Sequence, residues 1–391
     1  MKISRREAMK LFAGSVPAYY MSRALSLAAG DPNAPPADQA KAAASTKGLK
    51  DAFLEKFLIG TAADPGNYSD AELANIKANY NVMTPENCMK PANIHPAEDR
   101  YNWTNPDILV KFCEDNKMKV HGHTLAWHSQ TGRWFFDPGA DGQPVTRELA
   151  MERLEKHIST VVGRYKGRIM SWDVVNEAIN DGGNGQTENL RTNAPWYRAI
   201  GPDYLTLAFK WAHEADPDCQ LYYNDYNIDQ GAVKNTGKHA SSMLLLKRLI
   251  AEGAPINGVG IQGHWHLDTN IPDVEKAITN YESLGLKVSI SELDVTATGT
   301  NSGAMPGRGG GGSTTDWTEG FKKQAEVYAQ LFDIFSRHSN TVSRVTFWGL
   351  SDRRSWRSSQ RPLVFDAQLQ PKPAFQAIID VGLGKNTTVQ P

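Results

Sequence analysis

The stretch SWDVVNE at residues 171–177 begins as a short apolar run and ends in an amide and a carboxylate. Runs of this length, rich in valine and aromatic residues and followed by polar residues, are typical of buried strands. Similar runs recur along the chain. Together they predict eight strands, at residues 57–62, 82–84, 119–124, 171–176, 221–224, 259–263, 287–292 and 344–348.

Helical patterns lie between these strands. Ser69 is followed three residues later by Glu72, which is the pattern of a capping box at a helix start. Asn105 before Pro106 predicts a second helix start, with Asn105 as the N-cap. Apolar residues keep helical spacing at 154, 158, 161 and 165, and again at 321, 325, 328, 332 and 335. Eight strands alternating with helices predict an α/β fold, a (β/α)8 TIM barrel formed by a single domain.

Several predicted strands end in groups that can take part in chemistry. These ends are His123, Asn176-Glu177, Asn224-Asp225, Gln262-Gly263-His264, Glu292 and Trp348. Because the strands of a TIM barrel are parallel, their carboxyl ends meet at one rim, where barrel enzymes place their active sites. The sequence therefore predicts an enzyme whose site lies at that rim.

The charge balance of the chain excludes one class of function. Its 42 Lys and Arg nearly cancel its 43 Asp and Glu, so it lacks the basic excess that is typical of nucleic-acid-binding proteins. A hydrophobic fraction of 40% and ten Trp are typical of a folded enzyme. We therefore expect no nucleic-acid partner.

The three cysteines, Cys88, Cys113 and Cys219, lack the spacing of a metal site. We expect them to be buried thiols that pack like small apolar side chains. One disulfide bridge among them stays open as an alternative. Neither a metal ion nor an organic cofactor is expected.

The first residues of the chain resemble an export signal. Ser4-Arg5-Arg6 and the residues up to Lys10 are similar to the twin-arginine motif, and a weakly apolar run follows. We expect residues 1–29 to be this signal, which implies a periplasmic or extracellular protein, and residues 30–47 to be an Ala- and Pro-rich linker. The catalytic domain is expected at residues 48–383 and a tail at 384–391. Arg23 interrupts the apolar run, so no stable membrane insertion is expected.

Two interpretations of local segments stay open. The N-terminal residues could form a basic helix without a targeting role. Residues 299–315 contain the run GRGGGG and no apolar periodicity, and they follow the predicted strand that ends in Glu292. They are expected to form a rim loop, which is either a flap over the substrate or an insertion without a role.

Two carboxylates, Glu177 and Glu292, each close a predicted strand, and these strands are three apart in the predicted order. Positions on opposite sides of the barrel mouth would let both carboxylates face one substrate. Hydrolysis of a glycosidic bond uses such a pair, in which one carboxyl group protonates the leaving oxygen and the other acts on the sugar. Taken alone, each residue could instead be an ion-paired rim residue.

The motifs around these carboxylates resemble those of glycoside hydrolase family 10, the xylanases. WDVVNE at residues 172–177 and ISELD at 290–294 carry the resemblance. Five further segments match in order: ENCMK at 86–90, GHTLAWHSQ at 122–130, NDYN at 224–227, GIQGH at 260–264 and WGLSD at 348–352. The resemblance extends from about residue 49 to residue 381.

The resemblance implies a retaining endo-1,4-β-xylanase that acts on xylan and xylo-oligosaccharides without a cofactor. It implies that Glu177 is the acid/base and Glu292 the nucleophile. His264 is then expected to orient Glu292 and keep it ionised, with support from Asp294. We expect a monomer. The alternatives are a retaining barrel β-1,4-glucanase and a non-catalytic polysaccharide-binding barrel.

The resemblance also implies sugar contacts. Asn176 is expected to bind the 2-hydroxyl of the sugar being cleaved, Tyr226 to face the leaving group, and Trp348 and Trp356 to wall the cleft. The other expected contacts are Gln262 and, on the non-reducing side, Glu86, Asn87, Lys90, His123, Trp127 and Gln130. Polar groups suit the hydroxyl edges of a sugar, and aromatic rings suit its CH faces. Pro91 stands where the family commonly has Trp, so a ring of the distal non-reducing subsite is expected to be missing.

Overall fold

The computed structural model describes residues 47–138, 145–298 and 317–385. The expected export signal at residues 1–29 and nearly all of the expected linker at 30–47 lie outside the described residues. The expected rim loop at residues 299–315 and residues 386–391 of the expected tail also lie outside them. All described residues belong to one structural unit.

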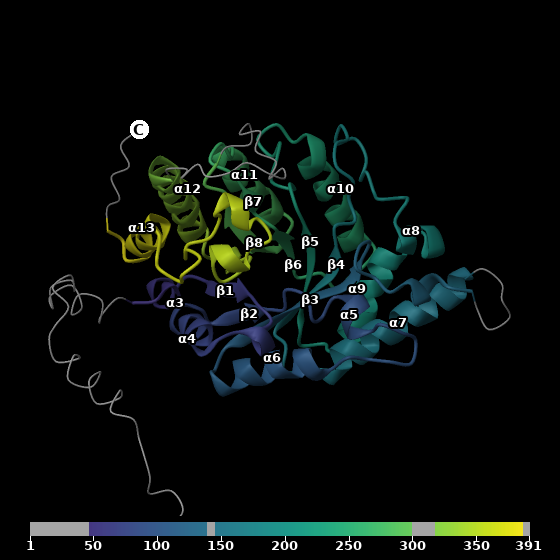
Figure 1. Cartoon of the computed structure of the whole chain (residues 1–391). Helices are drawn as coiled ribbons and strands as arrows, with labels where there is room; N and C mark the ends of the chain where they lie inside the picture. The colour runs from purple at the N-terminus through teal and green to yellow at the C-terminus, as the bar shows by residue number, and fades with distance from the viewer. Residues whose placement is uncertain (1–46, 139–144, 299–316, 386–391) are drawn as a thin grey trace, which may run out of the picture. The chain divides into compact units, whose positions relative to one another are not determined.

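The described residues contain nine parallel strands: β1 (Leu58–Ala62), β2 (Val82–Thr84), β3 (Lys119–Trp127), β4 (Ser171–Asn176), β5 (Gln220–Asp225), β6 (Gly258–Ile261), β7 (His264–Trp265), β8 (Lys287–Val295) and β9 (Val342–Phe347). Eight of them close into a ring, because β1 pairs with β9 and β6 pairs with β8. The two-residue strand β7 lies outside this ring, beside the end of β8. The predicted (β/α)8 barrel is confirmed, with the strands at the centre of the fold (Figure 1).

Helices surround the strands in Figure 1. Those in the described residues are α3 (Leu49–Ala52), α4 (Asp70–Asn79), α5 (Pro91–Ile94), α6 (Thr104–Asp115), α7 (Arg147–Arg164), α8 (Pro195–Ile200), α9 (Tyr204–Ala215), α10 (Gly237–Ala251), α11 (Ile271–Glu282), α12 (Thr318–Arg337) and α13 (Pro373–Gly382). The apolar spacing predicted the longest helix correctly: in α12, Tyr328, Phe332 and Phe335 are fully buried on one face.

The two predicted helix starts have different outcomes. Ser69 is the N-cap of α4, and its side chain and that of Glu72 each accept a hydrogen bond from the other residue's backbone N–H, as predicted. The prediction for Asn105 is wrong, because the N-cap of α6 is Trp103 and Asn105 lies in the first turn. The Trp103 ring stacks on Tyr101, with 4.8 Å between ring centroids. The start of α6 has no side-chain cap hydrogen bond, and the Arg164 guanidinium of α7 lies 4.5 Å from the centroid of the Trp103 ring.

Two strands run three residues past their predicted ends. β3 continues to Trp127 and β8 continues to Val295. The register of β3 against β4 shifts after His123, so the strand is irregular there and then resumes. The end of β8 pairs with β7, where His264 lies opposite Asp294. Both extensions place additional side chains at the carboxyl-terminal rim of the barrel.

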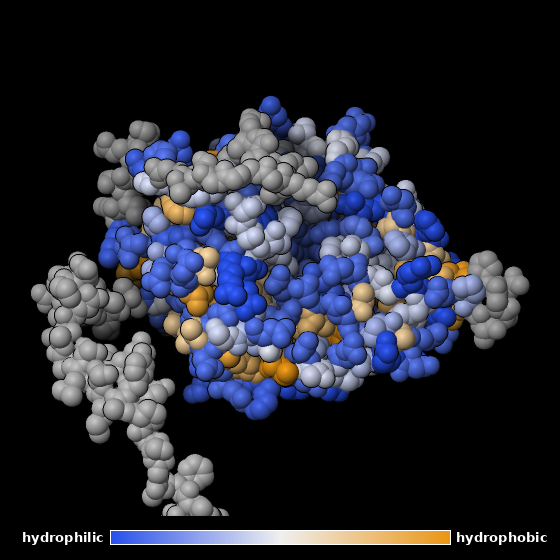
Figure 2. Space-filling view, in the orientation of Figure 1, coloured by the Kyte–Doolittle hydropathy of each residue, from blue (hydrophilic) through white to orange (hydrophobic). Residues whose placement is uncertain are grey.

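The face of the molecule shown in Figure 2 is mostly hydrophilic. Within the described residues, no helix combines the length and the apolar character needed to span a bilayer. Cys88, Cys113 and Cys219 are free and buried, which confirms the expectation of buried thiols.

Candidate active site

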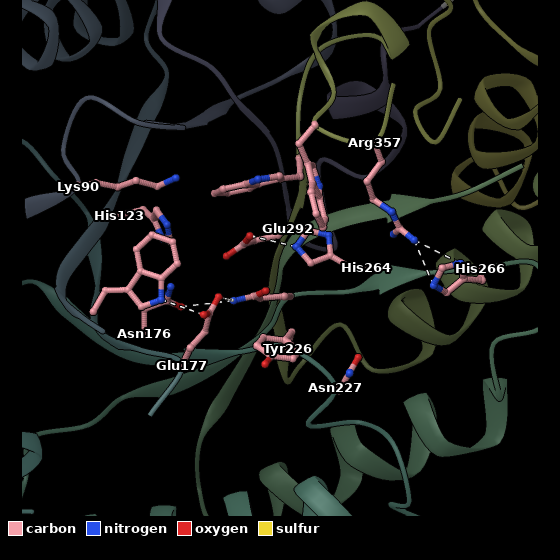
Figure 3. Close-up of a pocket in the computed structure, with 14 residues that line it drawn as sticks. Lys90, His123, Asn176, Glu177, Tyr226, Asn227, His264, His266, Glu292 and Arg357 are labelled. Atoms are coloured by element: carbon pink, nitrogen blue, oxygen red, sulfur yellow. Dashed lines mark hydrogen bonds and ion pairs between the residues drawn. The ribbon is translucent and has the colours of Figure 1, made fainter. Parts of the chain in front are cut away.

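A pocket of about 440 Å³ opens at the carboxyl-terminal rim of the barrel (Figure 3). In Figure 3 Lys90 and His123 lie at one end, Arg357 and His266 lie at the other, and Glu292 lies between them. The lining residues are Lys90, His123, Trp127, Asn176, Glu177, Tyr226, Asn227, Gln262, His264, His266, Glu292, Trp348, Trp356 and Arg357. Most of the residues that the sequence assigned to the site therefore meet in one pocket.

Glu177 directly follows β4. Its φ of 56° is in the left-handed region, so the chain changes direction at this residue. Its Oε2 accepts a hydrogen bond from the indole Nε1 of Trp127 at 2.8 Å, and its Oε1 accepts one from Nε2 of Gln262 at 3.0 Å. Two neutral donors therefore fix the position of this carboxyl group.

Glu292 lies within β8 and is only 5% exposed. Its Oε1 accepts a hydrogen bond from Nδ2 of Asn224 at 2.8 Å. The Asn224 amide is itself oriented by the hydroxyl of Ser291, which donates to its Oδ1 at 2.5 Å. The amide of Asn176 lies between those of Asn224 and Gln262, at 3.0 and 3.4 Å. A connected set of amides therefore lies next to Glu292.

His264 lies between two carboxylates. Its Nδ1 is 3.0 Å from Oδ2 of Asp294, and its Nε2 is 3.3 Å from Oε2 of Glu292. Burial alone would lower the pKa of His264, but the charges of Asp294 and then Glu292 outweigh burial and raise it to about 10. Asp294 also accepts hydrogen bonds from Trp356 Nε1 at 3.0 Å and Arg357 Nη1 at 2.6 Å. Asp294, which does not itself line the pocket, thus holds a positively charged His264 beside Glu292.

Lys90 is buried at its end of the pocket. Its Nζ lies 5.3 Å from the ring centroid of Trp127 and donates to Oδ1 of Asn87 at 3.2 Å. Burial, and next the charge of Asp64, raise the pKa of Glu86 to about 7, although Lys90 opposes this shift. Glu86 and Asn87 are not among the lining residues, and Asn87 lines a neighbouring polar groove of about 710 Å³. Both residues therefore stand next to the pocket at its Lys90 end.

Gln130 also lies apart from the pocket. Its side chain is exposed, and its carbonyl accepts a hydrogen bond from the backbone N–H of Ala92 at 2.8 Å. Pro91 is buried and begins α5, so a rigid helix start stands at the position where the resemblance implied a missing Trp ring. Asp294 is the remaining predicted residue that does not line the pocket, since it holds His264 from behind.

His123 is held from within the barrel. Its Nδ1 is 2.9 Å from Oδ2 of Asp173, and its ring meets Trp348 edge-on with 5.3 Å between centroids. The other oxygen of Asp173 lies 3.0 Å from Nε2 of His121. Burial alone would raise the pKa of Asp173, but His121 and His123 outweigh burial and keep it below its usual range. Asp173 therefore fixes the ring of His123 toward the pocket.

Tyr226 forms part of the wall on the other side of the carboxylates. Its ring centroid lies 3.3 Å from Nζ of Lys238, and its hydroxyl donates to Oδ2 of Asp181 at 2.7 Å. The same hydroxyl accepts a hydrogen bond from Nη2 of Arg191 at 2.7 Å. Three charged side chains thus fix the position of this ring.

Three lining residues were not predicted: Asn227, His266 and Arg357. Asn227 follows Tyr226 and Arg357 follows Trp356, so adjacency to a predicted contact was the available signal. His266 is two residues beyond His264, which places both side chains on the same side of the extended segment. Arg357 Nη2 lies 3.1 Å from Nε2 of His266, and this contact depends on the fold.

The pocket combines the groups that bind and cleave sugars. Carboxylates, amides, a lysine and histidines suit hydroxyl edges, and the rings of Trp127, Trp348 and Trp356 suit CH faces. Two carboxylates with different partners can act on one glycosidic bond as a proton donor and a nucleophile. Across residues 47–138, 145–298 and 317–385, no group of three or more His, Cys, Asp or Glu is placed to hold a metal ion.

Comparisons with known proteins agree with this arrangement. The family model of glycosyl hydrolase family 10 matches residues 48–381. Endo-1,4-beta-xylanase A of Thermoanaerobacterium saccharolyticum is 39% identical over 342 residues, which are 85% of this chain and 27% of that protein. Endo-1,4-beta-xylanase B of Paenibacillus barcinonensis is 36% identical over 343 residues, which are 85% of this chain and 97% of that protein.

A solved structure shows the same fold. The crystal structure of TsXylA, described as an intracellular xylanase of T. saccharolyticum, has a TM-score of 0.75 and 38% identity, and the match covers 85% of this chain and 98% of that chain. Some relatives are much longer, since this chain spans 29% of Exoglucanase XynX of Acetivibrio thermocellus. Because the family model matches most of its length, the chain belongs to glycosyl hydrolase family 10.

Proposed function

We propose that the protein is a retaining endo-1,4-β-xylanase whose substrates are xylan and xylo-oligosaccharides. The observation that carries the proposal is the placement of Glu177 and Glu292, which line one pocket and have different donors. Relatives that are named endo-1,4-beta-xylanase support it. Crystal structures of TsXylA are described as complexes with xylotriose and with xylotetraose, which supports the same substrate class.

The reaction has two steps. Glu292 attacks the anomeric carbon while Glu177 protonates the leaving oxygen, and a glycosyl-enzyme forms. Formation of this bond consumes the negative charge of Glu292, and His264 keeps Asp294 as its counter-ion. Glu177 then removes a proton from water, which releases the sugar with its β configuration retained.

The pocket has two sides in this proposal. In Figure 3, Glu177 and Glu292 lie between Lys90 and Tyr226. Lys90, His123 and Trp127 are assigned to the non-reducing side of the pocket, and Glu86, Asn87 and Gln130 to the surface beyond it on the same side. Tyr226 is assigned to the leaving-group side, and the Asn176 amide near Glu292 is assigned to the 2-hydroxyl of the cleaved sugar. Gln262, Trp348 and Trp356 complete the assigned contacts.

Azide distinguishes the roles of the two carboxylates. With a 2,4-dinitrophenyl xylobioside, Glu177→Ala should form the glycosyl-enzyme and then stall, because water lacks its base. Azide needs no base, so it should restart turnover and yield a β-glycosyl azide. In Glu292→Ala, azide should attack from the vacated side and yield the α product. Proton NMR of the adducts decides, and an α adduct from Glu177→Ala with a β adduct from Glu292→Ala would reverse the assignment.

A β-1,4-glucanase is the second candidate, because a relative 39% identical over 342 residues is named Exoglucanase XynX. Xylose lacks the hydroxymethyl group of glucose, so the room beside Trp348 and Trp356 should decide between the two substrates. We expect faster turnover of xylan than of carboxymethylcellulose, with a β anomer formed first. Preference for carboxymethylcellulose would favour the glucanase. Binding of xylan without turnover would favour a non-catalytic barrel.

We also propose that the enzyme is exported by the twin-arginine route. Ser4-Arg5-Arg6 supports this proposal and lies outside the described residues. The motif is recognised by a receptor, so another pair of positive charges should not replace it. Changing Arg5 and Arg6 to Lys should leave the activity in the cytoplasmic fraction. Undiminished export of this variant, or cytoplasmic activity of the unaltered protein, would contradict the proposal.

A further inference from the structure

The segment that follows β4 carries an arginine, Arg191, that contacts the backbone of Glu177. Nε of Arg191 donates a hydrogen bond to the carbonyl oxygen of Glu177 at 2.9 Å. The backbone N–H of Glu177 donates to the carbonyl of Asn224 at 2.8 Å. Residues other than glycine rarely adopt the φ of 56° that Glu177 has, so this conformation needs support from its surroundings. The two hydrogen bonds supply that support, one at each peptide group of Glu177.

The same guanidinium reaches the wall of the pocket. Nη2 of Arg191 donates to the hydroxyl of Tyr226 at 2.7 Å, and this hydroxyl donates to Oδ2 of Asp181. The guanidinium also lies 5.9 Å from the Tyr226 ring centroid. One planar side chain therefore connects the backbone of Glu177 to Tyr226, which the proposed function assigns to the leaving-group side.

Arg191 is itself held by the segment that contains it. Its backbone N–H donates to the carbonyl of Ala178 at 2.8 Å. Ile179 and Leu190 form an antiparallel bridge, and Nδ2 of Asn180 donates to the carbonyl of Leu190 at 2.9 Å. These contacts join the residues just after Glu177 to those just before Arg191. These contacts therefore hold the backbone of Arg191 in a fixed position relative to Glu177.

We propose that Arg191 is a positioning residue that fixes the carboxyl group of Glu177 relative to the leaving-group subsite at Tyr226. The inference rests on the proposed function, in which Glu177 donates the proton to the leaving oxygen. A misplaced acid slows bond cleavage when the leaving oxygen needs a proton, and it has little effect when the leaving group is stable as an anion. An arginine that only stabilises the fold would slow both reactions alike.

Two substitutions at Arg191 separate these possibilities. Arg191→Met removes both hydrogen bonds and keeps an unbranched side chain, and Arg191→Lys keeps the charge but loses the planar fork. The quantity to measure is kcat/KM for 2,4-dinitrophenyl and phenyl xylobiosides, because it reports the steps up to the first bond cleavage. In Arg191→Met we expect the loss with the phenyl substrate to be about tenfold greater than with the dinitrophenyl substrate. Arg191→Lys should show a smaller difference of the same sign.

Arg153→Met is the matched control. Arg153 is buried, does not line the pocket, and donates to Glu98 and to the carbonyls of Phe135 and Asp137. Its loss should lower the unfolding temperature and leave the ratio of the two kcat/KM values unchanged. If Arg191→Met does not fold, Tyr226→Phe is the second test. This substitution removes the hydrogen bond from Arg191 to the Tyr226 hydroxyl and keeps the aromatic ring. Tyr226→Phe should then lose more activity with the phenyl than with the dinitrophenyl substrate.

Equal losses with the two substrates in the folded Arg191 variants, or in Tyr226→Phe when these do not fold, would overturn the inference. The same selectivity in Arg153→Met would overturn it as well. Failure of the proposed function has a different signature, because the unaltered enzyme would then leave the dinitrophenyl xylobioside uncut.

Discussion

At the scale of single residues, the two carboxylates of the pocket meet different kinds of donor. Glu177 accepts hydrogen bonds from an indole and an amide, both neutral. Glu292 accepts one from an amide and lies beside the charged ring of His264. A fixed positive charge suits a group that reacts as an anion, and neutral donors suit a group that gives up and regains a proton.

The positions of these carboxylates could be predicted from the sequence, and the family resemblance placed His264 beside Glu292, but the hydrogen bonds that each carboxylate accepts could not be predicted. A strand that ends in a carboxylate is a local pattern, visible in a few residues. The donor to Glu292 is Asn224, 68 residues away in the chain, and Trp356 is 62 residues from its acceptor Asp294. Such pairs form only when the barrel closes, which is also why Arg357 was missed.

The charge of His264 leads to a prediction at alkaline pH. Its pKa in the folded protein is about 10, above the value of about 6.5 in an unfolded chain. The charged ring therefore contributes stability that is fully present below about pH 6.5 and is lost as pH rises toward about 10. Glutamine does not titrate, so the difference in free energy of unfolding between the wild type and His264→Gln should shrink over this range. Urea denaturation at several pH values measures it, and a difference independent of pH would contradict the prediction.

A buried histidine pair leads to the opposite prediction at acid pH. Nδ1 of His95 and Nδ1 of His157 are 3.1 Å apart, so one ring must donate and the other accept. Burial lowers the pKa of His95 to about 4 and that of His157 to about 3. Because the unfolded chain takes up these protons near pH 6.5, stability should be lost as pH falls from about 6.5 to about 4.

His157→Phe tests the role of this pair. The phenyl ring keeps an aromatic contact with Phe135, whose ring centroid lies 5.4 Å from that of His157, and it cannot be protonated. The unfolding temperature of the variant should fall less steeply with pH than that of the wild type, by calorimetry between about pH 7 and about pH 4. His213→Gln, on the exposed side of α9, controls for the loss of a histidine. An unchanged slope in His157→Phe would contradict the prediction.

At the scale of elements, the accuracy of the sequence-based prediction followed the range of the interactions. The start of α4 depends on Ser69 and Glu72, three residues apart, and it was predicted correctly. Trp103, the N-cap of α6, packs against Arg164 of α7, and the end of β8 pairs with β7. Neither of these contacts is visible in a local pattern, so both boundaries were misplaced.

The capping box at Ser69 can be tested by comparing two substitutions. Ser69→Ala removes the acceptor for the Glu72 N–H and should cost about 1 kcal/mol, whereas Ser69→Gly should cost only a few tenths. Glycine leaves the exposed N–H groups open to water and adopts the extended N-cap conformation readily. Urea denaturation gives both values, and activity per folded molecule should stay constant. A glycine variant less stable than the alanine variant would contradict this account of the cap.

At the scale of the whole molecule, the barrel closes between its first and last elements. β1 pairs with β9, and Gly382 at the end of α13 approaches Ala52 in α3. A Cβ atom added at Gly382 would lie 2.7 Å from Cβ of Ala52. The alternation of strands and helices predicted the barrel, but this close approach depends on the closure and could not be predicted.

Gly382→Ala should therefore destabilise the closure. The added methyl group has no room, and overpacking of this kind typically costs about 1–3 kcal/mol. Gly163→Ala in α7 is the matched control, because its Cβ would meet nothing within 4 Å and alanine favours a helix by about 0.5–1 kcal/mol. Thermal unfolding should give a lower midpoint for Gly382→Ala and an equal or higher one for Gly163→Ala. Equal midpoints for the two variants would contradict the prediction.

The contact between α3 and α13 also determines how the catalytic unit can be joined to other polypeptides. Because α3 and α13 are the first and last helices of the described residues and they touch, the two ends of this part of the chain lie close together in space. If this unit is inserted into a host protein, the two points of attachment in the host can therefore lie close together. A circular permutant needs only a short linker between the original ends. The matched region makes up 27% of one relative and 97% of another, so the same barrel is used both as one part of a long protein and almost alone.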